Sequence, residues 1–217
     1  MSKTTAFLTS SVGRKIIMSL TGFFLFSFLI VHLYINLFLF KQDQGATFDT
    51  YAEFMATYPL LRPLEIILFA GFLLHAFVGV WLWLTNRSVR PQPYKVHRAS
   101  ESSALASRIA FWTGLFVAVF LIIHINTFFI QSRFFPDGRP MSELVAEAFR
   151  SPLNDIFYLI ALVFLAYHLK HGFQSAFQTL GLRNTRYQHF IDIVGIFFWL
   201  IIPICFAAMP LYFLLAQ

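Results

Sequence analysis

Five long apolar segments run through this sequence, and they restrict the folds open to it more than any other feature. A helix needs about 20 apolar residues to cross the hydrocarbon core of a bilayer. Inside lipid, only helices and closed barrels satisfy every backbone hydrogen bond. The sequence therefore predicts a single all-α membrane domain over residues 1–217. Its five predicted transmembrane helices cover approximately 16–40, 66–84, 109–130, 155–177 and 191–215.

The composition agrees with a membrane protein. The chain is 58% hydrophobic, with 29 Phe, and 12% of its residues are charged, against about 25% in soluble domains. The formal charge of +6 falls between the spans, so it indicates membrane topology rather than nucleic-acid binding. The single cysteine, Cys205, leaves no disulfide, no CxxCH haem attachment and no cysteine ligand set for an iron–sulfur cluster. A redox group bound by this chain alone must therefore be held by histidine.

Basic and acidic residues separate between alternate loops. The N-terminal region, the 85–108 loop and the turn after the fourth span, counted with Lys170, hold eleven Lys and Arg against two acids. The other two loops, counted with Asp155, hold five Lys and Arg against eight acids. Positively charged loops stay in the cytoplasm. The sequence therefore predicts a cytoplasmic N-terminus and an outer C-terminus.

Each acidic loop contains a short amphipathic piece, and we expect the first to form a helix at the membrane surface. In TFDTYAEFMATY the helix is expected to end at Pro59 and Pro63. In SELVAEAFR, Ser142 is expected to serve as the N-cap. Pro203 and Pro210 are expected to kink the last span.

Four of the five spans carry a histidine at membrane depth: His32, His75, His124 and His168. Ionisable side chains inside a bilayer are costly and point to function. At about 1.5 Å per residue, His32 and His124 lie roughly 22–24 Å from the cytoplasmic ends of their spans, and His75 and His168 roughly 14 Å. The four form two depth-matched pairs, each between two helices, as a bis-histidine iron site requires. We expect helices one to four to form a haem-binding bundle, with the fifth beside it.

A competing interpretation is that each histidine bonds a neighbouring helix or lines a proton path. His171 also competes with His168 as a ligand, because it lies three residues on and near the same helix face. Its depth matches that of His75 less well, so we prefer His168. His97 and His189 fall in cytoplasmic loops and are expected to be solvated or interfacial.

Glycine adds a second regularity to the same four spans. Gly22 and Gly114 precede a histidine by ten residues, and Gly79 and Gly172 follow one by four. All four lie roughly 8 Å from the cytoplasmic face. Small residues let helices or a flat cofactor approach closely, so both ordinary helix packing and the edge of a haem fit this pattern.

The segments around the histidines resemble a known family. FLIVHLYIN, LLHAFVGVW, FLIIHINTFF and AYHLKHGFQSAFQTLG are similar to the four histidine segments of the di-haem cytochrome b subunit of succinate:quinone oxidoreductases. The chain looks like the b558-family, single-polypeptide anchor of bacterial succinate dehydrogenase, and the resemblance covers almost its whole length. It implies two haem b groups. The axial ligands would be His32 with His124 at the outer haem and His75 with His168 at the inner haem.

The resemblance also implies partners. Such a subunit anchors a flavoprotein with covalent FAD and an iron–sulfur subunit on the cytoplasmic side of the bacterial inner membrane. Electrons would pass from the iron–sulfur subunit through the inner and outer haems to a quinone, usually menaquinone. Succinate would be oxidised elsewhere in the complex, so this chain would supply no succinate chemistry.

Charged residues at the two ends of this route are candidates for binding roles. Arg62 and Glu65, at the outer mouth of the second span, are candidates for the quinone site, although ordinary interface residues fit there as well. At the inner edge, basic residues are candidates to pair with haem propionates or simply to mark the cytoplasmic side. These basic residues are Arg14, Lys15, Arg108 and Lys170.

Two other cytochrome functions fit the sequence, and a third alternative belongs to a different class of protein. The same anchor would serve a quinol:fumarate reductase working in the reverse direction. Another bis-histidine cytochrome b, such as the anchor of a hydrogenase or a formate dehydrogenase, would show the same histidines. A haem-free transporter would instead favour acids or broken helices at mid-membrane, and the first four spans contain no acid there.

Overall fold

The computed structural model describes residues 10–88 and 109–215, and every regular element in these two ranges is a helix. The predicted all-α class is confirmed for this part of the chain. Two residues considered above, His97 and Arg108, lie outside the described residues.

Five helical segments within the described ranges are long and apolar enough to cross a membrane. Their lengths of 25 to 30 residues correspond to roughly 38–45 Å, more than the hydrocarbon core requires. They coincide with the five predicted spans and extend beyond them at one end or both. The segments are α2 (Ser11–Asn36) with the 3₁₀ turn η1 (Leu37–Phe40), α4 (Leu61–Ser88), α7 (Ala110–His124) with the π-helical η2 (Ile125–Ile130) and α8 (Gln131–Phe134), α10 (Pro152–Thr179), and α11 (Gln188–Ile196) with the π-helical η3 (Phe197–Ile201) and α12 (Ile202–Leu215).

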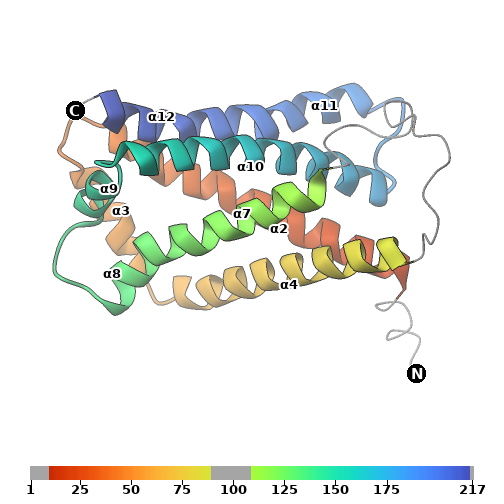
Figure 1. Ribbon diagram of the computed structural model, residues 1–217, viewed down its shortest axis with the longest axis horizontal. Coiled ribbons are helices and arrows are strands. Elements are labelled where there is room, and N and C mark those ends of the chain that lie inside the picture. Colours follow the sequence, from red (N-terminus) through yellow and green to blue (C-terminus); the bar gives the residue numbers. More distant parts are fainter. Residues whose placement is uncertain (1–9, 89–108, 216–217) are drawn as a thin grey trace.

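The long helices run side by side along one axis, as Figure 1 shows. Two short helices, α3 (Ala46–Thr57) and α9 (Met141–Ala148), gather at one end of the bundle, which we call the capped end. The opposite end carries Arg14 of α2 and Arg87 of α4, and we call it the basic end. Among the described residues, the two ends differ in structure as well as in charge, because short helices lie across the capped end.

Local sequence explains where several helices begin. The Ser10 hydroxyl accepts a hydrogen bond from the Gly13 N–H at 3.0 Å and caps α2. Pro152 stands in the first turn of α10, where a missing N–H costs nothing. Likewise, Pro63 lies in the first turn of α4 rather than in the loop before it, so only Pro59 follows the end of α3.

The two prolines of the last span act differently. Pro203 cannot donate a hydrogen bond to the preceding turn, and the helix widens into the π-helical η3 directly before it. Pro210 lies inside α12 without interrupting it. The irregularity expected in this span therefore takes the form of one π-helical turn.

Helix α10 is central to the packing. It contacts α2, α7, α11 and α12, whereas α4 packs against α2 and α7 on the other side of the bundle (Figure 1). Phe26 of α2, Phe173 of α10 and Ile191 of α11 form one buried cluster, in which the Phe26 and Phe173 rings meet edge to face. Many other large apolar side chains point outward; Leu73 and Ile122 are 72% and 70% exposed. Such surfaces suit lipid rather than water.

Two hydrogen bonds join the short helices α3 and α9 at the capped end. The Asp49 carboxylate of α3 accepts hydrogen bonds from the Ser142 N–H at 2.7 Å and from the Ser142 hydroxyl at 2.6 Å. The prediction that Ser142 caps its own helix is therefore wrong. Helix α9 begins at Met141, one residue before Ser142. The Ser142 N–H, which has no partner within the first turn of the helix, is satisfied by the Asp49 carboxylate of α3.

Candidate metal centre

The structure brings the four membrane-depth histidines together in two pairs. The ring centres of His32 in α2 and His124 in α7 are 5.8 Å apart, and the rings are nearly perpendicular at 87°. Those of His75 in α4 and His168 in α10 are 6.2 Å apart at 81°. These are the partners expected from depth alone. The first pair lies toward the capped end and the second toward the basic end.

Both spacings suit one metal ion held between two imidazoles. A metal–imidazole bond is about 2 Å long, and a ring nitrogen lies about 1 Å from its ring centre, so two rings on opposite sides of one ion have centres about 6 Å apart. Within residues 10–88 and 109–215, no group of three or more His, Cys, Asp or Glu side chains is placed to hold a metal. An octahedral metal ion has six ligand positions, and two imidazoles fill only two of them. A flat tetradentate group such as haem supplies the other four ligands.

The Nδ1 atom of His75 has a hydroxyl group as its partner. The Thr21 hydroxyl lies 3.0 Å from Nδ1 of His75 and also donates to the Ile17 carbonyl at 2.9 Å. When the hydroxyl proton is donated to that carbonyl, the Thr21 oxygen accepts from His75, and this arrangement places hydrogen on Nδ1. The lone pair of His75 is then on Nε2, as a metal ligand requires.

The pair toward the capped end is also held by polar and aromatic neighbours. The hydroxyl of buried Tyr158 in α10 lies 3.3 Å from Nδ1 of His124. Asn36 donates to the His32 carbonyl at 2.8 Å, while its amide nitrogen is 3.5 Å from His32 Nδ1, too long to fix a tautomer. Phe28 stacks on the His32 ring at 5.2 Å. The Tyr158 contact orients the His124 imidazole, and the Phe28 ring covers one face of the His32 imidazole.

His168 approaches a neighbouring helix so closely that only glycine fits opposite it. A Cβ atom at Gly114 would lie 2.9 Å from Cε1 and 3.2 Å from Nδ1 of His168. That Nδ1 atom is buried without a hydrogen bond of good geometry, although the Ala110 backbone is near enough to interact with the ring. At Gly22 a Cβ atom would lie 3.6 Å from Cε1 of His75. Two of the four glycines therefore line this histidine pair.

The other two glycines have no such role. A Cβ atom at Gly79 would make ordinary contact with Met18, and one at Gly172 would meet nothing within 4 Å. Of the four glycines at this depth, Gly22 and Gly114 therefore lie against a histidine, whereas Gly79 and Gly172 lie at positions of ordinary packing or open space.

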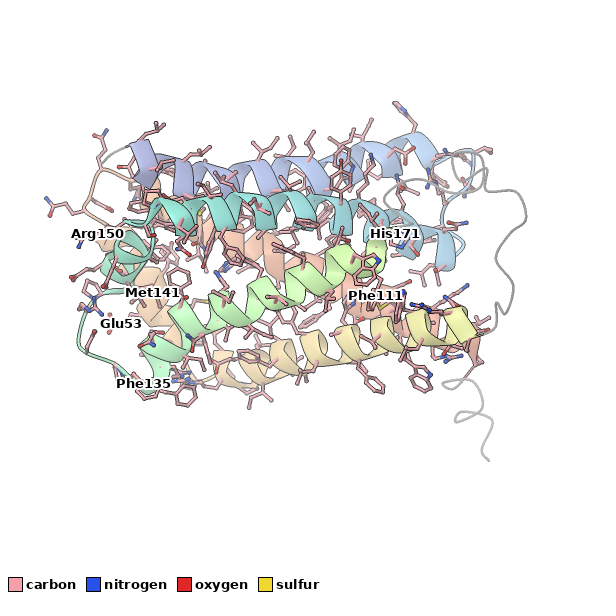
Figure 2. All side chains as sticks on the ribbon, viewed as in Figure 1. Glu53, Phe111, Phe135, Met141, Arg150 and His171 are labelled. Atoms are coloured by element: carbon pink, nitrogen blue, oxygen red, sulfur yellow. The ribbon has the colours of Figure 1, made fainter. Side chains whose placement is uncertain are left out.

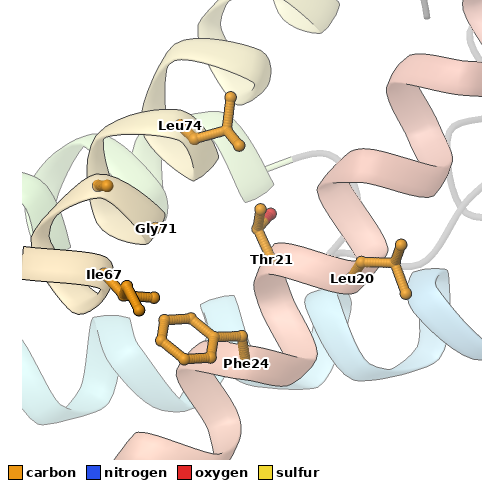
Figure 3. Close-up of a pocket in the computed structure, with 7 residues that line it drawn as sticks. Leu20, Thr21, Phe24, Ile67, Gly71 and Leu74 are labelled. Carbon is orange, nitrogen blue, oxygen red and sulfur yellow. The ribbon is translucent and has the colours of Figure 1, made fainter. Parts of the chain in front are cut away.

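An apolar groove lies beside the Thr21–His75 contact. It measures about 350 Å³ and runs between α2 and α4. Figure 3 shows Thr21 facing Leu74 and Gly71 across it, with Phe24 and Ile67 further along. Thr21 contributes the one hydroxyl of the lining, and that hydroxyl is engaged by His75.

The remaining described histidines are not drawn into either pair. His171 is half-buried, lies toward the basic end in Figure 2, and has no ring contact with His75. His189 in α11 is exposed. The geometry thus favours His168 over His171 as the partner of His75.

Arg62 and Glu65 meet a third residue that the sequence did not suggest. The Glu65 carboxylate accepts from Arg133 at 3.1 Å and lies 3.6 Å from Arg62. Arg133 also donates to the Ala56 carbonyl at 3.2 Å, so it links α8 to α3 and α4. No sequence pattern singles out Arg133, because it is 68 positions from Glu65 and only the fold brings the two together.

Aromatic rings hold two of the basic residues at the opposite end. The buried Arg14 guanidinium lies 4.8 Å from the Trp81 ring and donates to the Thr85 hydroxyl at 3.2 Å. The Lys170 ammonium lies 4.5 Å from the Trp199 ring. These cation–π contacts stabilise positive charge at the end of the bundle. Lys15 is exposed.

No family model, curated protein or solved structure matches the chain. Its class follows from the fold: an all-helical bundle with five helices able to cross a membrane. Within that class, the two histidine pairs are the feature that points to a chemistry.

Proposed function

We propose that this chain is a di-haem cytochrome b membrane anchor that transfers electrons between an iron–sulfur subunit and a quinone, as in succinate:quinone oxidoreductases. The observation that carries the proposal is the presence of two histidine pairs on four helices, each pair at the spacing of two imidazoles on one iron. Four unrelated core histidines have no reason to occur at that spacing twice.

The residues present fit haem b. His32 with His124 and His75 with His168 would be the axial ligands, and bound haem would supply one-electron chemistry. Gly22 and Gly114 keep the backbone clear beside the second pair. Thr21 holds His75 in the tautomer that leaves Nε2 free. Two histidine ligands for each haem would suit electron transfer rather than substrate binding at the iron.

The protein between the two pairs is apolar and aromatic. Phe116 of α7 and Phe164 of α10 stack at 4.2 Å at positions between the pairs along both helices. By helical rise, the pairs are about 9 Å apart in depth. The chain's own part in the transfer is thus to hold two centres at a short, fixed separation and to keep water away from them.

The direction of transfer rests on the charge of the two ends. In the proposed orientation the basic end faces the cytoplasm of a bacterium. The FAD and iron–sulfur subunits would bind there, and electrons would enter at the His75–His168 site. They would leave from His32–His124 toward a quinone bound near Arg62, Glu65 and Arg133, and the family resemblance points to menaquinone. Each electron moving outward gains about 2.3 kcal/mol per 100 mV of membrane potential.

The haem content of the purified full-length chain tests this function. We expect two haems per polypeptide, which a redox titration resolves as two components of different midpoint potential. A protein that binds no haem when produced with a sufficient haem supply would overturn the proposal. One haem per chain would contradict the two-site arrangement.

A further inference from the structure

Asp155 is a buried carboxyl group that the proposed electron route does not use. It lies in the first turns of α10, its side chain is 0% exposed, and neither carboxylate oxygen has a hydrogen-bond partner. A buried carboxylate without a partner is costly, so such a group takes up a proton or serves a ligand. The position therefore calls for a functional explanation.

No cation compensates Asp155. None of the ion pairs among the described residues involves it. Toward the capped end, the long helices packed against α10 bring His32 and the exposed Tyr34 of α2, His124 of α7, and Cys205 and the half-exposed Tyr212 of α12, whereas η3 brings no titratable group. Tyr158 is on α10 itself, and Asp192 and His189 of α11 lie toward the basic end. The short helices α3 and α9 share a buried cluster with Tyr158 and bring no cation, only Asp49, Tyr51, Glu53, Glu143 and Glu147.

Asp155 lies close to the His32–His124 site along its own helix. Tyr158, whose hydroxyl is 3.3 Å from His124 Nδ1, follows it by three residues, or about 4.5 Å along the helix axis. Tyr158 thus connects the turn that carries Asp155 to the histidine pair. Because charges interact strongly where little water intervenes, we expect a change of charge at the histidine pair to act on Asp155.

We propose that Asp155 is a proton-exchange site linked to reduction of the His32–His124 centre, an inference that rests on the proposed function. One electron delivered by the iron–sulfur partner adds one negative charge to the centre, and the Asp155 carboxylate binds one proton from the capped side. When the electron passes on to the quinone, the Asp155 carboxyl releases that proton. Charge and protons balance in each half of the cycle.

A redox titration of the haem-loaded full-length protein at several pH values tests this link. Because reduction takes up a proton, the midpoint potential of the outer centre should fall as the pH rises. The limiting slope is about 59 mV per tenfold change in proton concentration. In Asp155→Asn the slope of the outer centre should flatten while that of the inner centre stays unchanged. Glu143→Gln, which removes an exposed acid at the same end, is the matched control and should keep the wild-type slope.

The outcomes separate the two proposals. If two haems are bound and Asp155→Asn keeps the wild-type slope, the proton is exchanged elsewhere, for example on the haem propionates, and only this inference is overturned. If no haem is bound, the proposed function fails first.

A second measurement keeps the inference testable if Asp155→Asn does not fold. In wild-type protein carrying ¹³C-carboxyl aspartate, the reduced-minus-oxidised infrared spectrum should contain a protonated-carboxyl band that shifts with the label. The other described aspartates, Asp43, Asp49, Asp137 and Asp192, each accept hydrogen bonds or lie exposed. Absence of a label-sensitive band would overturn the inference.

Discussion

The Thr21 hydroxyl of α2 lies 3.0 Å from Nδ1 of His75 in α4, and its own proton is donated to the Ile17 carbonyl. One threonine is thus placed to orient a histidine 54 positions away, and by accepting from Nδ1–H it selects the tautomer with a free Nε2. It also raises the basicity of the imidazole, because an acceptor on Nδ1–H makes Nε2 a stronger donor to a metal.

Replacing Thr21 with valine should weaken haem binding at the basic-end site. Loss of such a partner typically lowers metal affinity about 10–100-fold, and a less basic imidazole raises the midpoint potential. Thr21→Ser keeps the hydroxyl and is the matched control. Haem retention and the midpoint potential of each centre are the measurements. An unchanged basic-end centre in Thr21→Val would show that the hydroxyl does not act on the ligand.

The choice between His168 and its neighbour His171 can be tested by removing each. His168 faces His75 at 6.2 Å, whereas His171 has no ring contact with it. We therefore expect His168→Ala and His75→Ala to lose the same, basic-end haem and His171→Ala to keep both. Haem stoichiometry with low-spin electron paramagnetic resonance signals distinguishes these cases. Loss of a haem in His171→Ala would reassign the ligand.

Two glycines of equal predicted depth should respond in opposite ways to alanine. A Cβ atom at Gly114 would lie 2.9 Å from His168 Cε1, so either the ring or the helix must shift. At Gly172 the same atom meets nothing within 4 Å, and alanine favours the helix by up to about 1 kcal/mol. We expect Gly114→Ala to alter the spectrum of the basic-end haem and Gly172→Ala to leave both spectra unchanged. Equal effects of the two variants would contradict the close approach at Gly114.

The features that could be predicted from the sequence are those that depend on position along a helix. Helical rise is nearly constant, so counting residues was enough to match His32 with His124 and His75 with His168 in depth. The spans themselves follow from apolar length, which composition alone reveals. Both kinds of inference need no knowledge of how a helix is rotated about its axis.

What the sequence could not reveal depends on that rotation and on contacts between distant residues. Thr21 looks like an ordinary polar residue in a span until α4 is placed beside it. Asp155 counts as one more acid of the outer loop by sequence, yet the side of α10 on which it lies is buried. Arg133 and Asp49 act on residues far along the chain, Glu65 and Ser142, which no local pattern connects.

The link between the two short helices provides a last test, independent of haem. Asp49 accepts two hydrogen bonds from Ser142, and an added Cβ at Gly45 would lie 2.5 Å from the Ser142 Cβ, so the helices are in close contact there. Asp49→Ala removes both acceptors and leaves the N–H in the first turn of α9 without its partner. A lost cap of this kind costs about 0.5–2 kcal/mol.

Thermal unfolding of the purified protein in detergent should therefore show a lower midpoint for Asp49→Ala. Ser142→Ala should have a smaller effect, because its backbone N–H can still donate to Asp49. Glu53→Ala, which removes an exposed acid from the same helix, is the control and should unfold like the wild type. If Asp49→Ala unfolded at the wild-type temperature, the contact between α3 and α9 would not contribute to the stability of the capped end.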